Sequence, residues 1–329
     1  PVDLLLVEAD PAGGEPRALT DAPKVQHHLG VIETFSPDGR HILYAANDRD
    51  QTCQDVLMLD LSTEAVVRLV TAEGLHYPNG FSPDGRYVAV TRLNSNTDAD
   101  LLLVEPGVTD PANPPTLSPH EGEAKHEPGP WKPDGSAILA ITDQGREFAG
   151  LAEFGLAAGA PAWVEKPEWD VEQVVVSGDG AVMAWTVNED GYSRLHVRSL
   201  VTGNPIDVPE IPGGAVTTLR ISNDGRRLAF LLATATRPTE VMAVDLDTST
   251  VRLLTDSTPP ALQQVTAVES DLIRYPTHDG RDIAAYLYRP VGDGPFPVVL
   301  SIHGGPEAQE RPMYMYAGFY QYLLAQGIG

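Results

Sequence analysis

The six residues Phe81-Ser82-Pro83-Asp84-Gly85-Arg86, followed directly by the apolar alternation Tyr87-Val88-Ala89-Val90, decide the fold of this 329-residue chain. The phrase returns at residues 35–40 and, with substitutions, at residues 131–136, 176–180 and 221–226. The aspartates of the five copies are spaced by 46, 50, 45 and 45 residues: Asp38, Asp84, Asp134, Asp179 and Asp224. A period of about 40–50 residues is typical of the blades of a β-propeller.

Each copy has the chemistry of a tight turn between two strands. Proline presets φ for the first corner of the turn, aspartate accepts backbone N–H bonds, and glycine adopts the positive φ that ends it. A second strand pair follows most copies, such as residues 55–60 and 65–70 around the polar segment 62–64. Four short antiparallel strands make one propeller blade. A single Pro-Asp-Gly would indicate only a surface turn, whereas five copies at near-constant spacing favour the propeller.

We therefore predict an all-β propeller over residues 1–258, made of half a blade and then five complete four-stranded blades with the Asp-Gly turn at the same place in each. The complete blades are expected near residues 27–72, 76–118, 126–168, 171–209 and 215–256. Residues 4–10 and 13–20 have the pattern of a closing strand pair whose opening pair is absent. Because the other end stops where a helix would lead into a strand, we expect the chain to be truncated at both ends.

Composition limits the partners. The formal net charge of −24 argues against nucleic acid and anionic membranes, which require a basic surface, although acidic surfaces also serve solubility. No apolar run approaches the roughly 20 residues of a membrane-spanning helix. Cys53 is the only cysteine, which excludes an intrachain disulfide and a cysteine metal cluster. A reducing, cytoplasmic location fits this composition.

Five histidines border the starts of predicted blades: His27, His28, His76, His120 and His126. A metal site requires two or more ligands on one local scaffold, and adjacent residues on a strand point to opposite faces. We therefore favour packing at the surface or rim over metal binding. The acidic turn at residues 188–191 lacks the ligand spacing of a calcium loop. We expect no metal and no other cofactor.

After Pro259 the pattern changes. We predict a strand hairpin from residues 272–276 and 283–290 around a turn at 278–280. The wholly apolar residues 298–302 predict a strand buried on both faces, as in a parallel sheet. Residues 316–326 place Phe319, Tyr322 and Leu323 at helical spacing, which predicts a helix packed on that sheet. Residues 259–329 are thus predicted to begin a second, incomplete α/β domain.

The segment His303-Gly304-Gly305 follows the apolar strand directly. In α/β-hydrolases such a loop supplies a backbone N–H that stabilises the oxyanion of acyl transfer, and glycines let the backbone approach the substrate carbonyl. With Pro306 after it, the hairpin turn at 279–281 before it and the propeller in front, the whole chain resembles the prolyl oligopeptidase family of serine peptidases (peptidase S9). It is most similar to the acylaminoacyl-peptidase and dipeptidyl-aminopeptidase-like branch.

This resemblance implies a propeller, of seven blades in the full-length parent, that caps an α/β-hydrolase domain with a Ser-Asp-His triad. By position, Gly305 would donate its N–H to the oxyanion, while His303, Gly304 and Pro306 would shape the loop. The family's Gly-x-Ser-x-Gly nucleophile elbow does not occur in the sequence, and Ser301 within the apolar strand is a poor candidate nucleophile. The triad is therefore expected outside this chain, and the chain alone is predicted to be inactive.

The resemblance implies that the parent is a hydrolase acting on short peptides or on acyl or aminoacyl peptides. The partners would be a short peptide substrate and the missing C-terminal catalytic segment. Whether the protein also forms a homo-oligomer is left undecided by the sequence. Two alternatives remain. A non-enzymatic propeller that binds protein partners would have no use for residues 272–329. An ester or amide hydrolase acting on a non-peptide is permitted, because fold does not determine substrate.

Overall fold

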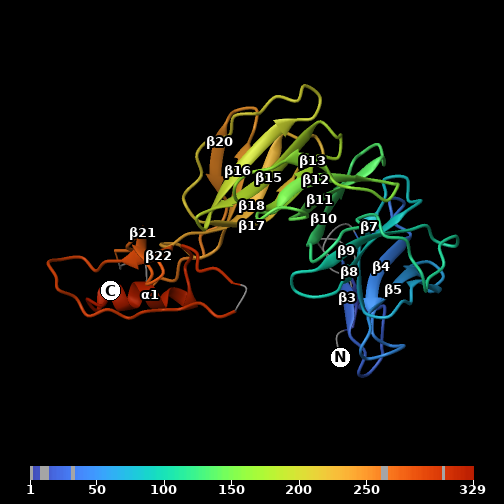
Figure 1. Ribbon diagram of the computed structural model, residues 1–329, viewed down its shortest axis with the longest axis horizontal. Coiled ribbons are helices and arrows are strands. Elements are labelled where there is room, and N and C mark those ends of the chain that lie inside the picture. Colours follow the sequence, from blue (N-terminus) through green and yellow to red (C-terminus); the bar gives the residue numbers. More distant parts are fainter. Residues whose placement is uncertain (1–2, 8–14, 31–33, 261–265, 306–307) are drawn as a thin grey trace. The chain divides into compact units, whose positions relative to one another are not determined.

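The computed structural model describes residues 3–7, 15–30, 34–260, 266–305 and 308–329 (Figure 1). Within these ranges the regular secondary structure is almost entirely β, in seven antiparallel sheets, with one short α-helix near the C-terminal end. The predicted fold class, an all-β propeller followed by the first elements of an α/β-hydrolase domain, is confirmed. The chain divides into two compact units, residues 1–168 and 169–329, and each is described by itself. The predicted domain boundary at residue 258 stays a prediction.

The first unit begins with a two-stranded sheet, β1 (Leu5–Leu6) and β2 (Arg17–Ala18), where the half blade was predicted. The next sheet has the four strands expected of a blade, and each strand pairs with the one that precedes it in the chain. Its strands are β3 (His27–Leu29), β4 (His41–Ala46), β5 (Asp55–Asp60) and β6 (Val66–Val70).

The following sheet has three strands instead of the predicted four: β7 (Leu75–Phe81), β8 (Val88–Leu93) and β9 (Ala99–Val104). A single bridge between Leu102 and Thr116 replaces the fourth strand. Three prolines within residues 111–115 explain this, because proline has no N–H to donate to a strand ladder. The unit ends with a four-stranded sheet of β10 (His126–Trp131), β11 (Ala137–Thr142), β12 (Gly150–Gly155) and β13 (Ala162–Glu165).

The second unit contains the same two kinds of sheet, one with three strands and one with four. A three-stranded sheet contains β14 (Asp170–Val176), β15 (Val182–Glu189) and β16 (Tyr192–Ser199), and a bridge from Arg198 to Pro205 again replaces the fourth strand. A four-stranded sheet follows, made of β17 (Ala215–Ile221), β18 (Arg227–Ala233), β19 (Glu240–Asp245) and β20 (Thr250–Leu253).

The recurring phrase forms the same turn in each blade, between the first and second strands. In the first copy Asp38 accepts hydrogen bonds from the Ser36 hydroxyl at 2.5 Å and from the Arg40 amide at 3.0 Å, and Gly39 has a φ of 69°. The copies at Asp84, Asp179 and Asp224 repeat these bonds. The copy at Asp134 takes its hydroxyl from Ser136, after the glycine. The hydroxyl bond, with help from the amide bond, lowers the pKa of all five carboxyls.

Apolar side chains of consecutive sheets pack face to face. In the first unit Leu43 and Val56 of one sheet join Val88 and Leu102 of the next in one buried cluster. In the second unit Val197 lies in a cluster with Phe230 and the neighbouring strands of the next sheet. Each blade therefore buries its apolar face against its neighbour in the chain, as the stacking of repeats requires.

After the blades, β21 (Ser270–Pro276) and β22 (Asp282–Tyr288) form the predicted hairpin. The predicted buried strand at residues 298–302 is wrong: the segment is not a strand, and Leu300 and Ile302 are 79% and 78% exposed. Its backbone contacts the last residue, with Val299 N donating to Gly329 O at 2.8 Å and Gly329 N donating to Pro297 O at 2.9 Å. A strand that is buried on both faces belongs to a sheet whose two faces are covered by helices. Among the described residues, no strand pairs with this segment to make such a sheet.

The predicted helix at residues 316–326 is shorter than expected, with the 3₁₀ turn η1 (Tyr316–Gly318) followed by α1 (Phe319–Ala325). Its buried residues are Gln321 and Leu324, whereas Phe319 and Tyr322 are exposed, so the predicted packing face is wrong. Gln321 explains the orientation, because its side-chain amide donates to the carbonyls of Ala235 and Val268 at 2.9 Å. Among the described residues, no helix has the length and hydropathy needed to cross a membrane.

Candidate active site

The predicted oxyanion loop lies at the surface. His303, Gly304 and Gly305 are all exposed, and the Nδ1 atom of His303 contacts the carbonyl oxygen of Gly304 at 2.7 Å. A Cβ atom added to Gly304 would meet no atom within 4 Å, so packing in this chain does not require glycine there. Pro306, the fourth predicted loop residue, lies outside the described residues. The oxyanion role of Gly305 stays a prediction.

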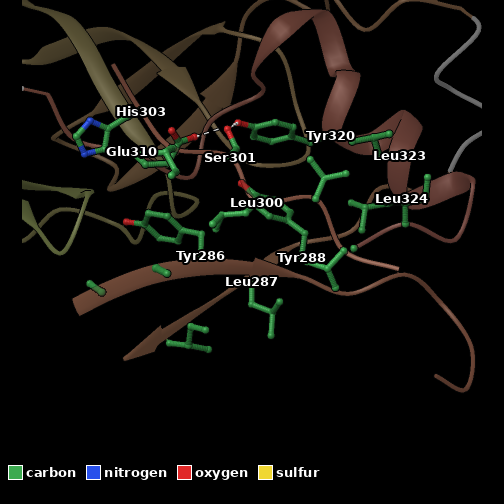
Figure 2. Close-up of a pocket in the computed structure, with 18 of the residues that line it drawn as sticks. Tyr286, Leu287, Tyr288, Leu300, Ser301, His303, Glu310, Tyr320, Leu323 and Leu324 are labelled. Carbon is green, nitrogen blue, oxygen red and sulfur yellow. Dashed lines mark hydrogen bonds between the residues drawn. The ribbon is translucent and has the colours of Figure 1, made fainter. Parts of the chain in front are cut away.

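An apolar cavity of about 1100 Å³ lies beside this loop, between the β21–β22 hairpin, residues 298–302 and α1 (Figure 2). Side chains of Leu287, Leu300 and Leu323 contribute to its walls. Three tyrosines of the hairpin also line it, Tyr275, Tyr286 and Tyr288; burial raises the pKa of Tyr286 and raises that of Tyr288 to about 12. The phenols of Tyr286 and Tyr288 therefore stay neutral at physiological pH and can donate hydrogen bonds.

One wall of the cavity carries a line of polar groups, visible in Figure 2. The hydroxyl of Ser301 lies 2.9 Å from the hydroxyl of Tyr320, which donates to Glu310 Oε1 at 3.4 Å. A serine nucleophile requires a general base within hydrogen-bond reach. The hydrogen-bond partner of Ser301 in the described structure is a tyrosine hydroxyl, and the role of Ser301 stays a prediction.

The tip of the β15–β16 hairpin contacts the segment that carries the loop. Asp190 and Gly191, both at positive φ, form a two-residue turn between the paired residues Glu189 and Tyr192. The hydroxyl of Tyr286 donates to the carbonyl of Asp190. A Cβ atom at Gly191 would lie 2.0 Å from that hydroxyl oxygen, so only glycine fits.

Arg311 makes the most extensive of these contacts. Its guanidinium donates to Glu172 Oε1 at 2.5 Å, to the carbonyl of Gly191 at 2.8 Å and to the hydroxyl of Ser193 at 3.0 Å. Two residues earlier, Gln309 Oε1 accepts a hydrogen bond from Asn188 at 2.7 Å. This cluster could not be predicted from the sequence, because Arg311 and Glu172 are 139 residues apart and neither belongs to a recurring motif.

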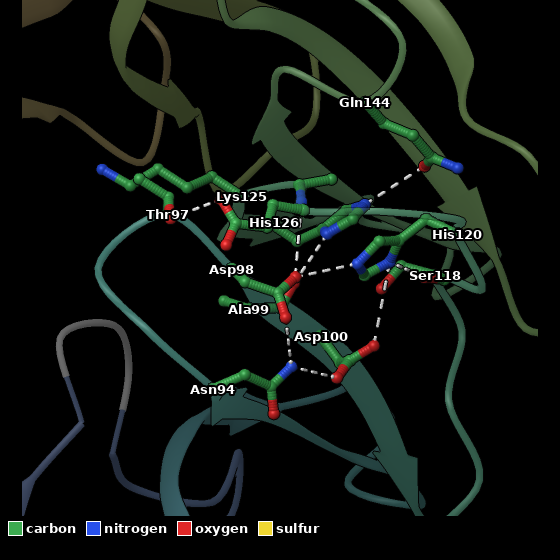
Figure 3. Close-up of polar contacts among 12 residues, drawn as sticks. Asn94, Thr97, Asp98, Ala99, Asp100, Ser118, His120, Lys125, His126 and Gln144 are labelled. Atoms are coloured by element: carbon green, nitrogen blue, oxygen red, sulfur yellow. Dashed lines mark hydrogen bonds and ion pairs between the residues drawn. The ribbon is translucent and has the colours of Figure 1, made fainter.

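Three of the five histidines are buried within the blades and not at the surface or rim as predicted, whereas His28 and His120 are half-buried. His76 and His126 are fully buried and His27 is 5% exposed. In the first unit, the Nδ1 atom of His126 contacts the carbonyl of Ala99 at 2.7 Å, and His120 Nε2 lies 2.9 Å from Asp98 Oδ1 (Figure 3). Within the described ranges, no group of three or more His, Cys, Asp and Glu side chains is arranged to hold a metal ion.

Comparison with known proteins adds one curated relative and many solved structures. The chain is 24% identical over 336 residues to dipeptidyl aminopeptidase BIII of Pseudoxanthomonas mexicana, a match that covers 99% of this chain and 48% of that protein. The chain thus spans about half the length of the curated relative that it matches. No family model matches the sequence.

Among solved structures, a puromycin-hydrolyzing peptidase of Mycobacterium tuberculosis is similar with a TM-score of 0.78 and 21% identity, over 98% of this chain and 52% of that one. A prolyl endopeptidase is similar with a TM-score of 0.63 and 16% identity, over 96% of this chain and 55% of that one. At these identities the structures establish the fold. Together with the curated relative, they confirm the predicted resemblance to the prolyl oligopeptidase family.

Proposed function

We propose that this chain supplies the propeller and the first part of the catalytic domain of a serine peptidase that hydrolyses short peptides, or acyl or aminoacyl peptides. The observation that carries the proposal is the similarity to a dipeptidyl aminopeptidase over 99% of the chain, which includes both the blades and the His303-Gly304-Gly305 segment. A non-enzymatic propeller is disfavoured, because it would have no use for the β21–β22 hairpin and the loop that follows it.

In the proposed reaction a serine from outside this chain attacks the scissile carbonyl. A bond forms between the serine oxygen and the carbonyl carbon, and the electron pair of the C=O bond moves to its oxygen. The N–H of Gly305 donates to that oxyanion, which stabilises the transition state more than the ground state. A base, also from outside this chain, takes the serine proton; the C=O bond then re-forms, the C–N bond breaks, and the amine leaves with that proton before water hydrolyses the acyl-enzyme. This chain contributes half of the oxyanion hole and no triad.

Labelling with a fluorophosphonate probe tests the proposal that the nucleophilic serine lies outside this chain. We expect the full-length parent to be labelled stoichiometrically and to hydrolyse aminoacyl and acyl-amino-acid reporters. The 329-residue chain alone should be neither labelled nor active, because the nucleophile and its base must be in mutual contact. Heat-sensitive, stoichiometric labelling of the 329-residue chain would show that it carries its own nucleophile.

The role of Gly305 is tested by Gly305→Pro in the parent, which removes the N–H donor itself. Losing one oxyanion donor typically lowers kcat about 10²–10³-fold. Gly305→Ala is the companion variant, because it changes the same position but keeps the N–H donor. Both variants must melt near the Tm of the parent. A kcat of the folded Gly305→Pro protein within a few-fold of the parent's would reject the role.

Hydrolysis of a non-peptide amide or ester is the second candidate. The similarity to a puromycin-hydrolyzing peptidase favours it. Comparing kcat/KM of the parent for aminoacyl-amide, acyl-amino-acid and ester reporters separates the two candidates, because specificity is a ratio of these values. Because an ester is intrinsically easier to cleave than an amide, the comparison that decides is between the amides: a kcat/KM for a non-peptide aminoacyl amide more than about tenfold above that for a peptide reporter would favour the second candidate.

A further inference from the structure

The β15–β16 hairpin differs from its counterparts in the other blades. Its two strands have eight residues each, whereas the second and third strands of the other blades have six or seven. The extra length places the turn at Asp190 and Gly191 against residues from beyond the blades, Tyr286 and Arg311. The hairpin is therefore a contact element as well as part of a blade.

A second difference concerns one position in the third strand of each blade. The position can be matched between blades by counting from the recurring turn and following the strand pairing. At this position three blades carry a buried carboxylate: Asp55, Asp100 and Glu240, exposed by 1%, 6% and 2%. The β14–β16 blade has Arg194 there, paired with Val187 and exposed. A partly buried carboxylate of this blade, Glu172, lies in its first strand instead. The arginine that pairs with Glu172 comes from outside the blade.

The contacts of Arg311 use the planar fork of the guanidinium. Three of its nitrogens donate to three kinds of acceptor: the Glu172 carboxylate, the Ser193 hydroxyl and the Gly191 carbonyl. The side chains of Arg311 and Glu172 are only 16% and 22% exposed. A lysine, with one ammonium group, cannot reproduce this arrangement. The position of Arg311 on the hairpin is therefore strongly specified.

The predicted oxyanion loop is held where it begins and where it ends. Tyr320 contacts Ser301 just before the loop and Glu310 just after it, so it closes the base of the segment between them. On the far side, Gln309 bonds to Asn188 and Arg311 bonds to Glu172, which fixes that base on the β14–β16 blade. Gly305 lies within this closed segment.

We propose that Arg311 is a positioning residue, which anchors the base of the oxyanion loop to the β14–β16 blade through Glu172, Ser193 and the Gly191 carbonyl and so sets where the Gly305 amide points. This inference rests on the proposed peptidase function. Arg311 acts through the loop and not on the substrate. A misplacement of about 1 Å in a catalytic group can cost about 10²-fold in rate.

The first test uses Arg311→Met in the full-length parent. We expect kcat to fall about 10–100-fold with KM within a few-fold of the parent's, because the variant misplaces a donor used in the transition state. Arg311→Lys should recover only part of the loss. Arg274→Met is the matched control, since it removes another arginine that contacts the same hairpin, at Asp190, without touching residues 309–311. Its kcat should stay within about twofold.

The second test does not depend on activity. Hydrogen exchange of the 329-residue chain should become faster at residues 299–311 in Arg311→Met, while residues 170–199 and the Tm stay close to those of the unchanged chain. If the parent hydrolyses no reporter, the proposed function fails. Hydrogen exchange still tests whether Arg311 anchors the loop segment to the blade. The inference would be overturned by unchanged hydrogen exchange in Arg311→Met, or by a rise in KM without a fall in kcat. It would also be overturned by faster exchange throughout the chain with a large fall in Tm, which would indicate general destabilisation.

Discussion

Two arginine–carboxylate clusters show how similar chemistry serves different purposes. In the β3–β6 blade, Asp55 accepts hydrogen bonds from Arg49 at 2.8 and 2.9 Å and from Arg68 at 2.9 Å, and all three residues lie within 20 positions of one another. In the β14–β16 blade, Glu172 is bonded to Arg311, which is 139 residues away. The first cluster stabilises one repeat. The second connects a repeat to the segment that carries the candidate site.

The two clusters also differ in burial. Asp55 is 1% exposed, whereas Glu172 is 22% exposed. Removing one partner of a buried ion pair leaves an uncompensated group out of water, and this costs more than breaking a pair that water reaches. We therefore expect the largest effect on stability in the local cluster and the largest effect on activity in the long-range one.

The strongest test of this comparison is Asp55→Asn in the 329-residue chain. We expect the free energy of unfolding to fall by about 3 kcal/mol, because two arginines lose their buried carboxylate. Asp48→Asn is the control: Asp48 also pairs with Arg68, but it is 36% exposed and should cost less than about 1 kcal/mol. Urea denaturation measures both. Equal losses of unfolding free energy in the two variants would contradict the conclusion that burial of the carboxylate determines the size of the effect.

A smaller effect is expected for Gly191→Ala at the tip of the β15–β16 hairpin. The new Cβ meets the Tyr286 hydroxyl, and the φ of 84° strains any residue other than glycine, so the free energy of unfolding should fall by about 2 kcal/mol. Gly203→Ala is the matched control, because its φ is 74° and its Cβ would meet no atom within 4 Å. Thermal denaturation of the two variants compares them. If Gly191→Ala loses no more stability than Gly203→Ala, the hairpin tip does not pack against the Tyr286 hydroxyl.

The smallest effect concerns pH and His120 in the first unit. Burial lowers the pKa of His120, but its hydrogen bonds to the Ser118 carbonyl and to Asp98, with the Asp100 charge, raise it above the usual value of 6.5. The stability that protonated His120 contributes is therefore fully present below about pH 6.5 and is lost as pH rises through the raised pKa. His120→Gln should lower Tm more at pH 5.5 than at pH 8.5.

Asp98→Asn serves as the control for this pH dependence, because it removes the carboxylate that His120 contacts at 2.9 Å. In an Asp98→Asn background, the effect of His120→Gln on Tm should differ less between the two pH values. The His126 ring, whose centroid is 5.0 Å from that of His120, remains in both proteins. An effect of His120→Gln that is the same at both pH values in the unchanged background would contradict the assignment.

Local chemistry made the blades predictable. The turn from Ser36 to His41 is closed by the residues of the phrase itself, so every recurrence in the sequence marks the same hairpin in the structure. The fourth strands of two blades were predicted and are absent as strands. The prolines in those segments are visible in the sequence, and they lack the N–H groups that a fourth strand would donate to its neighbour.

The candidate site was predictable only in part. The His303-Gly304-Gly305 motif could be read from adjacent residues, but its anchors could not. Tyr286 contacts Asp190 across 96 residues and Arg311 contacts Glu172 across 139 residues, and no periodic pattern in the sequence indicates either contact. The apolar residues 298–302 were predicted to be buried, because the pattern reports what a segment can bury and not whether its neighbours are present.

The sequence by itself determined the repeating blades, their Asp-Gly turns and the hairpin that follows them, because each of these closes between residues that are near one another in the chain. Tertiary structure decided where the loop segment is held, which face of α1 is buried and which carboxylate pairs with Arg311. These features depend on hydrogen bonds between groups that only the folded chain brings within 3 Å, such as Gln321 with Ala235 and Arg311 with Gly191.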